Sequence, residues 1–523
     1  MKLRSVLPSA QVQSKRFVLA LAAALLVVVP ALRGQQEQTY TLHTDVREIM
    51  LDVVVTDQKG NIVKGLKQSD FTIYENGVVQ RTRSFREPQD HEMPDLGKAM
   101  VHSTADLAKI GNAPVTLLVL DELNTTFEDM AYARNRMEKF LNAQPEVLKQ
   151  PAILLAATNT NFEVIHDYTQ DRAELLLALK KHQPDFPWKA MRSGNNSSGA
   201  FERMSQSLNS LLQIAQASRG TKGRKTVIWV GKGFPSVNLV NIDPDSENLI
   251  QDAMKRLTQE LLSDRVTLFT IDPESSLTNQ ANISTTDDLE EFESQSDGQP
   301  FKDEVKFSTL APATGGVALY SRNDIDAELA EAVEKGAFYY TLTYSPSDPT
   351  TDPNKYRAVR IKMSNPAWKA TTRDGYYAMP NKSAAEELAA QAPKQQKEEL
   401  QAEMGKAALG SIAYNGLNVT LEKTVAGFKL GVPAGDLRWV DTPAGKTRAE
   451  ITVMLVAFSA KDKALAHASQ ELSAEIAGHI SNPAQKAYFA IKPLDVPKTR
   501  RFRVVVRDAE SGKIGTCDLA VQP

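Results

Sequence analysis

The spacing of hydrophobic positions changes several times along the chain, and each change predicts a different kind of structure. Between residues 41 and 88 apolar and polar residues alternate, as in half-buried strands. The Asn76-Gly77 pair favours a hairpin turn, because both turn positions need a positive φ. We expect a small β module of about four strands here. The polar stretch 89–112 is predicted to be a linker with little capacity to form a core.

From residue 113 to 345, continuous apolar runs alternate with apolar stripes of helical spacing. Runs such as residues 115–120 are typical of strands buried on both faces of a parallel sheet. Strands that alternate with helices indicate right-handed βαβ crossovers. The pattern predicts a doubly wound, mostly parallel α/β domain over 113–345.

The last third of the chain changes texture again. Residues 346–380 are predicted to add strands, packed either on the α/β domain or on the N-terminal β module. Residues 381–407 are rich in Ala, Glu, Gln and Lys, which indicates a charged, solvated helical linker. Short alternating segments over 408–523 predict a β-sandwich. The expected fold class is therefore a multi-domain combination of α/β and all-β parts.

The N-terminus predicts export. Basic residues precede an unbroken apolar run over 17–29, which as a helix would measure about 20 Å, too short for a hydrocarbon core of about 30 Å. A basic segment, a short apolar segment and then small and polar residues are typical of a cleaved signal, here residues 1–34. An uncleaved anchor is the alternative. We expect a periplasmic or extracellular protein without a transmembrane segment after cleavage.

Composition excludes several classes of function. With 61 Lys and Arg against 64 Asp and Glu, the chain has no general basic field, which argues against a nucleic-acid partner. The single cysteine, Cys517, excludes internal disulfides and cysteine-rich zinc modules. The sequence has no HExxH pair and no Gly-x-Ser-x-Gly elbow. We therefore expect a protein that is not an enzyme.

The candidate site residues follow the predicted parallel strands. Ligands of open α/β sheets bind beyond the carboxyl ends of the strands. Asp121, Asn124 and Thr125 follow the first strand, and Lys232 follows the strand that ends at residue 230. We expect these residues to lie together at one edge of the sheet.

Several strings, in a fixed order over residues 40–380, resemble the bacterial VWFA-related family described from Acidobacteria and, more broadly, von Willebrand factor type A domains. They are 53–57 (VVVTD), 70–77 (DFTIYENG), 120–121 with 124–125 (LD, NT), 167–171 (DYTQD), 223–230 (GRKTVIWV), 340–346 (YTLTYSP) and 373–377 (RDGYY). The resemblance implies a type A-like fold. It also implies a metal-ion-dependent adhesion site, in which carboxylate and hydroxyl oxygens hold Mg²⁺ or Mn²⁺.

This chain departs from the pattern that the resemblance implies. Asp121 and Thr125 match the Asp and the second hydroxyl, but Leu123 stands at the first hydroxyl position. Ser197, Ser198 and Thr169 compete for the hydroxyl of the third loop, with Ser197 assigned to the metal set.

A cation follows the strand that ends at residue 230. Lys232 stands where the family has an Asp-Gly pair. A fixed ammonium at this place would weaken the binding of a divalent ion. Two interpretations are therefore open: a degenerate site for Mg²⁺ or Mn²⁺, or a structural ion pair between Asp121 and Lys232. The second is favoured, so we expect no cofactor.

The resemblance implies an adhesion-type protein that binds a protein partner. The partner-binding residues would be Asp121, Asn124, Thr125, Thr169 and Lys232. One alternative is a structural scaffold of the cell envelope that acts through its β modules. A lesser alternative is a hydrolase of envelope polymers.

Overall fold

The structure is a computed structural model in which most of the chain after residue 47 is described. The described residues are 48–97, 100–158, 162–184, 197–240, 242–274, 299–319, 324–348, 352, 355–378, 383–442 and 445–521, without the side chains of 197 and 198. All of them belong to one compact unit, residues 47–523. The predicted signal segment lies outside them.

A six-stranded sheet occupies the middle of the chain, in the order β12-β10-β8-β5-β6-β7. Its strands are β5 (Val115–Asp121), β6 (Val147–Ala157), β7 (Phe162–Asp171), β8 (Lys225–Val230), β10 (Val266–Ile271) and β12 (Ala318–Leu319). All neighbours in this sheet are parallel except β6 and β7, which are antiparallel. Every residue of β5, β8 and β10 is buried, as the continuous apolar runs predict.

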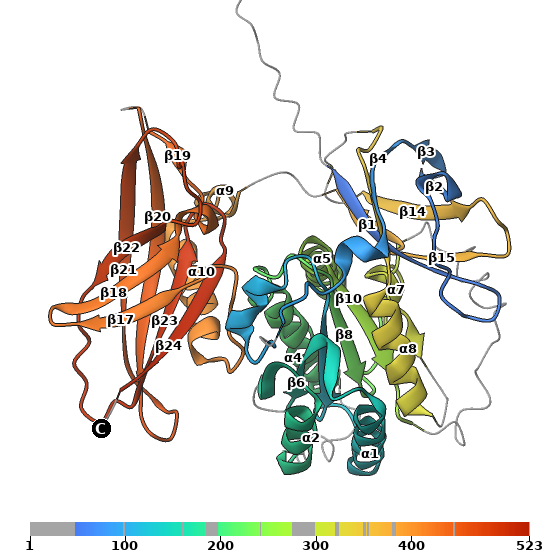
Figure 1. The fold of residues 1–523 in the computed structure, drawn as a ribbon, viewed down its shortest axis with the longest axis horizontal. Coiled ribbons are helices and arrows are strands. Elements are labelled where there is room, and N and C mark those ends of the chain that lie inside the picture. Colours follow the sequence, from blue (N-terminus) through green and yellow to red (C-terminus); the bar gives the residue numbers. More distant parts are fainter. Residues whose placement is uncertain are drawn as a thin grey trace, which may run out of the picture. The chain divides into compact units, whose positions relative to one another are not determined.

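Helices cover both faces of this sheet (Figure 1). They are α1 (Phe127–Ala143), α2 (Arg172–Lys181), α4 (Ser197–Ala217), α5 (Pro244–Ser263), α7 (Leu310–Ala313) and α8 (Ile325–Ala337). Successive residues of β5 point to opposite faces. Leu117 belongs to the core that includes residues of α4 and α5, whereas Leu118 belongs to the core formed with α1, α2 and α8. The region is therefore a layered arrangement of mixed α/β type.

Two four-stranded sheets combine residues from both sides of this α/β region. Their orders are β15-β1-β13-β4 and β16-β14-β2-β3. The strands are β1 (Ile49–Thr56), β2 (Phe71–Glu75), β3 (Val78–Gln80), β4 (Thr82–Arg86), β13 (Tyr340–Tyr344), β14 (Tyr356–Met363), β15 (Lys369–Thr371) and β16 (Gly375–Tyr377). Asn76 and Gly77, with φ of 48° and 79°, form the predicted turn between β2 and β3.

Two features of the structure differ from the sequence prediction. Strand β13 was assigned to the α/β domain, but it pairs with β1 and β4 and not with the six-stranded sheet. The stretch 89–112 was expected to contribute little to a core. Instead it includes most of the 3-10 helix Pro88–His91 and all of the 3-10 helix Thr104–Lys109. Its Val101, Leu107 and Ile110 are buried in the same core as Leu117.

The C-terminal part is built from two further sheets, β17-β18-β22 and β19-β20-β23-β24, with β21 paired to β20. The strands are β17 (Thr420–Thr424), β18 (Gly427–Pro433), β19 (Val440–Asp441), β20 (Lys446–Phe458), β21 (Ala464–Ala477), β22 (Lys486–Ile491), β23 (Arg501–Asp508) and β24 (Ile514–Ala520). Leu430 and Ile491 of the smaller sheet share one core with Leu455 and Val504 of the larger.

Two helices precede these sheets, α9 (Ala384–Ala389) and α10 (Pro393–Leu409). The predicted helical linker is helical, but the last turns of α10 are not solvated. Met404, Ala407 and Ala408 are buried in the core that also contains Met454 and Val505. Among the described helices, none combines the length and the apolar character that crossing a membrane would require.

Candidate functional site: the crevice at the ends of β5 and β8

The candidate site lies where β5 and β8 end side by side. Leu120 of β5 is in register with Val230 of β8, so Asp121 and the segment 231–233 leave the sheet together. The other neighbour of β5 is β6, which is the next strand of this sheet along the chain. The strand order therefore reverses at β5, and in open α/β sheets a crevice forms beyond the carboxyl ends of the strands at such a point.

The Asp121 carboxylate is completely buried and is held by N–H donors. Its Oδ1 accepts from the backbone N–H of Asn124 at 3.0 Å, and its Oδ2 accepts from that of Gly233 at 2.8 Å. The Nδ2 of Asn124 lies 3.1 Å from Oδ1 and 3.3 Å from Oδ2, and it also donates to Ser207 Oγ at 3.1 Å. Burial raises the pKa of this carboxyl, and the Asn124 and Gly233 donors act in the opposite direction.

Thr125 is also buried, and its Oγ1 accepts from the backbone N–H of Lys232 at 3.2 Å. The approach of the two loops depends on Gly231, whose φ is 148°. A Cβ at this position would lie 2.2 Å from the Asp121 Cβ and 2.5 Å from the Thr125 Oγ1. Only glycine therefore allows the segment after β8 to turn its backbone N–H groups toward Asp121 and Thr125.

The prediction of an ion pair between Asp121 and Lys232 is wrong. The Lys232 ammonium lies 3.0 Å from a Glu274 carboxylate oxygen and 3.8 Å from an Asp129 oxygen. The reason is the orientation of the loop, which presents the N–H groups of residues 232 and 233 to the β5 side. The Lys232 side chain consequently points away from Asp121. Its ammonium pairs with carboxylates from α1 and from the segment after β10.

A hollow of about 190 Å³ opens beside this loop. It is lined by Gly231, Lys232, Phe234, Ser236, Thr270, Asp272, Lys306, Phe307 and Ser308. Burial raises the pKa of the Asp272 carboxyl, which accepts from the backbone N–H of Glu274 at 2.9 Å. The hollow is therefore lined by hydroxyl, ammonium and carboxyl groups together with the aromatic side chains of Phe234 and Phe307.

The predicted metal ligands are not assembled as expected. Asp121 and Thr125 meet, but the oxygens of both accept N–H groups, and Leu123 is buried. The side chains of Ser197 and Ser198 lie outside the described residues. Within the described ranges, no three His, Cys, Asp or Glu side chains gather closely enough to hold a metal ion.

Thr169 lies at the other end of the sheet, which corrects its assignment to the site. Thr169 pairs with Ala152 of β6, whereas Asp121 pairs with Ala157 of the same strand. Thr169 and Asp121 are therefore five strand residues, about 17 Å, apart along the direction of β6. The Thr169 Oγ1 donates to Glu174 Oε2 at 2.6 Å. Thr169 thus stabilises the start of α2.

Two features of the site have no local sequence signal. Glu122, completely buried, lies 2.8 Å from His182 Nε2 at the end of α2, 60 positions along the chain. Ser207, which accepts from the Asn124 amide, lies in the middle of α4. Both contacts depend on tertiary packing rather than on any spacing that a sequence displays.

Comparisons with known proteins add little to this geometry. A scan against protein-family models gives no match, and a search of curated proteins gives no match either. Among solved structures, the VWA domain of SpRpn10 aligns at 15% identity and a TM-score of 0.19, over 33% of this chain and 83% of that one. The PilB minor pilin from Streptococcus sanguinis aligns at 9% identity and a TM-score of 0.25, over 44% of this chain and 62% of that one. At such TM-scores neither likeness carries an argument about the site.

Proposed function

We propose that this chain is an exported, non-enzymatic protein that binds a protein partner at the crevice beyond β5 and β8, without a metal ion. The proposal includes a doubly wound, type A-like domain of the VWFA-related kind, followed by a C-terminal β-sandwich. The observation that carries it is the set of N–H groups of residues 124, 232 and 233 that donate to Asp121 and Thr125.

The metal-free form of the proposal follows from the direction of these hydrogen bonds. A divalent cation needs the lone pairs of carboxylate and hydroxyl oxygens. Here the Asn124 amide faces both Asp121 oxygens, and it can only donate to them. A metal ion would have to displace this amide and the loop backbone together.

The hollow beside the loop is proposed as the contact surface. Lys232, Ser236 and Ser308 line it, and the Lys232 side chain is 29% exposed. Polar groups together with aromatic side chains suit a protein loop that supplies both hydrogen bonds and apolar contact. An enzymatic role is not proposed, because the Asp121 carboxylate is occupied by N–H donors rather than turned toward the hollow.

The test is site-specific photo-crosslinking in the producing cells, with a benzophenone amino acid at Ser236 or Ser308. We expect the same protein adduct at both positions, formed equally with EDTA and with Mg²⁺. A matched position is Leu177 on α2, which is 53% exposed and should give no such adduct. Adducts that require Mg²⁺ would contradict the metal-free proposal.

A scaffold role remains a second candidate because of strand β21. It spans Ala464–Ala477, and in the described sheets only β20 pairs with it, which leaves its other edge open. Open edges can pair with strands of another chain. Adducts from Leu465 on β21 but not from Ser236 or Ser308 would favour this role over the crevice.

A further inference from the structure

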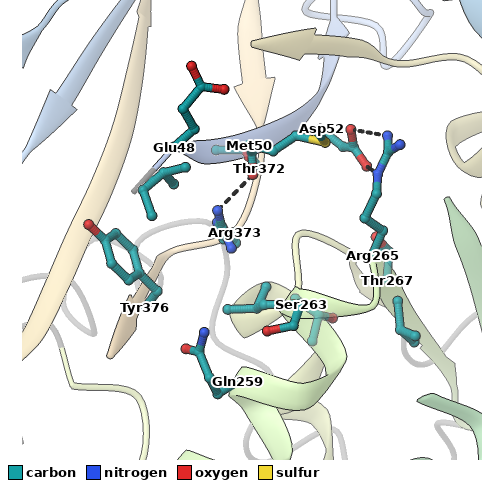
Figure 2. A pocket seen from close by; sticks show the side chains of 14 residues that line it. Glu48, Met50, Asp52, Gln259, Ser263, Arg265, Thr267, Thr372, Arg373 and Tyr376 are labelled. Carbon is teal, nitrogen blue, oxygen red and sulfur yellow. Dashed lines mark hydrogen bonds and ion pairs between the residues drawn. The ribbon is translucent and has the colours of Figure 1, made fainter. Parts of the chain in front are cut away.

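A second pocket lies at the opposite end of the six-stranded sheet from Asp121. It has a volume of about 360 Å³ and lies between β1, the end of α5 and the loop from β15 to β16 (Figure 2). Arg265 and Val266, at the start of β10, line it, whereas Asp272 in the crevice hollow follows the end of that strand. The pocket is therefore separate from the crevice of the proposed function.

Arg373 enters this pocket from the loop between β15 and β16, as Figure 2 shows. Its Nη2 donates to the Met50 carbonyl at 2.7 Å, but its Nε is buried without a hydrogen-bond partner. Among the described residues no carboxylate lies within ion-pair distance of its guanidinium. The adjacent Thr372 Oγ1 is likewise buried without a partner. The Arg373 guanidinium also lies over the Tyr376 ring, 5.6 Å from its centroid, but its Nε and the Thr372 hydroxyl lack the hydrogen-bond partner that buried polar atoms normally have.

The two guanidinium groups that line the pocket, of Arg265 and Arg373, are partly buried and outnumber its one partly buried carboxylate, that of Asp52. Asp52 holds Arg265 through two contacts, at 2.7 Å and 3.3 Å. Arg224, 1% exposed, donates to Thr267 Oγ1 and to backbone carbonyls rather than to a carboxylate. Asp52, whose side chain is 13% exposed, thus lies near Arg265 and Arg373, which line the pocket, and near Arg224, which does not.

The second carboxylate that lines the pocket does not change this balance. Glu48 is exposed, and its carboxylate points away from Arg373 in Figure 2. Burial lowers the pKa of Arg373, because its charged form is poorly solvated at this position.

We infer that this pocket binds a carboxylate, with Arg373 as the group that pairs with it. The Thr372 hydroxyl is the neighbouring donor, and the apolar walls formed by Ile49, Met50 and Leu262 suit an apolar group attached to the carboxylate. The volume accommodates a group the size of one or two amino-acid residues. The carboxylate belongs either to a small molecule or to the C-terminus of a peptide.

Isothermal titration of the full mature chain separates these two sources. The probes are N-acetyl-leucine, its amide, a six-residue peptide that ends in leucine, and the same peptide amidated at its C-terminus. We expect heat from both free carboxylates and none from the two amides. A peptide at least tenfold tighter than N-acetyl-leucine identifies a peptide terminus as the source, and equal affinity identifies a small carboxylate.

Variants test the assignment to this pocket. Arg373→Gln should reduce the affinity for the free carboxylates at least tenfold, whereas the matched change Arg360→Gln on the exposed side of β14 should leave it unchanged. Ser263→Trp leaves Arg373 in place and fills the pocket from an exposed position on α5, so it should also abolish binding. Equal binding of amides and acids, no binding of either acid, or unchanged binding by both variants would overturn the inference.

Discussion

The side-chain amide of Asn124 donates to both carboxylate oxygens of Asp121, at 3.1 Å and 3.3 Å, and so lies between them. In a metal-dependent adhesion site an ion would take the place of this N–H group. The charge of the carboxylate is balanced here by dipoles of the protein itself. The Asn124 amide should therefore contribute to the stability of the fold.

Asn124→Ala should lower the free energy of unfolding by about 1–3 kcal/mol, because the buried Asp121 oxygens lose a donor. Urea unfolding followed by circular dichroism measures the change. Asn142→Ala, at an exposed position on α1, is the matched control and should cost less than about 0.5 kcal/mol. Equal costs for the two variants would show that the amide contributes nothing.

Lys232→Ala should cost less than about 1 kcal/mol, because the ion pairs of Lys232 with Glu274 and Asp129 are partly exposed and screened by solvent. Asp121→Ala should cost more, about 2–3 kcal/mol, since it leaves the N–H groups of residues 124 and 233 without acceptors. Urea unfolding at low and high salt measures both. A loss for Lys232→Ala as large as that for Asp121→Ala would restore the ion pair predicted from the sequence.

His91 makes the stability depend on pH between about 4 and 6.5. Its side chain is 1% exposed and stacks on Tyr339, with ring centroids 4.5 Å apart, and burial lowers its pKa from 6.5 to about 4. The unfolded chain then binds a proton that the folded chain does not. Stability therefore falls as pH decreases from 6.5 toward 4, by up to about 3 kcal/mol.

Unfolding midpoints of wild type and of His91→Gln across this pH range measure the effect. The slope should flatten in His91→Gln and persist in His479→Gln, a change at an exposed position. A slope that survives in both variants would assign the pH dependence to other groups.

Glu75 joins strands from both sides of the α/β region. Its carboxylate accepts from Tyr344 at 2.7 Å, Tyr376 at 2.8 Å and Arg357 at 2.7 Å, and it is 3% exposed. Glu75→Gln would leave the buried Arg357 guanidinium without its main countercharge, at a cost of about 3–5 kcal/mol. Chemical unfolding measures the change, and Glu92→Gln, at an exposed position, should have almost no effect.

The strands of the α/β region could be predicted, but their partners could not. The apolar runs at β5 and β8 predict buried strands, and both lie in the six-stranded sheet. Strand β13 has the same buried pattern, yet it pairs with β1. An apolar run indicates burial on both faces, but it carries no information on which sheet supplies the neighbours.

The candidate site, too, could be predicted only in part. The strand-end rule predicts that Asp121 and the segment after β8 meet, and they do. The direction of the Lys232 side chain depends on positive φ at Gly231 and Gly233, which the sequence permits but does not specify. Thr169 was misplaced because a strand pattern is the same in either direction, and β7 runs antiparallel to β6.

Three of the seven strings that carry the family resemblance have a structural explanation. Residues 70–77, 340–346 and 373–377 supply Glu75, Tyr344 and Tyr376, which form one buried hydrogen-bond network. These three strings therefore contain side chains that hold neighbouring strands together.

The two antiparallel four-stranded sheets also constrain when the protein can complete its fold during synthesis. Glu75 and Tyr344 are 269 positions apart, so the first strands emerge from the ribosome long before their partners. At 5–20 residues per second this wait lasts roughly 15 to 50 seconds. During that interval β1 and β2 have open edges while the intervening α/β region is being made. Neither four-stranded sheet can therefore be completed before translation has passed its last strand, β15 in one sheet and β16, which ends at Tyr377, in the other.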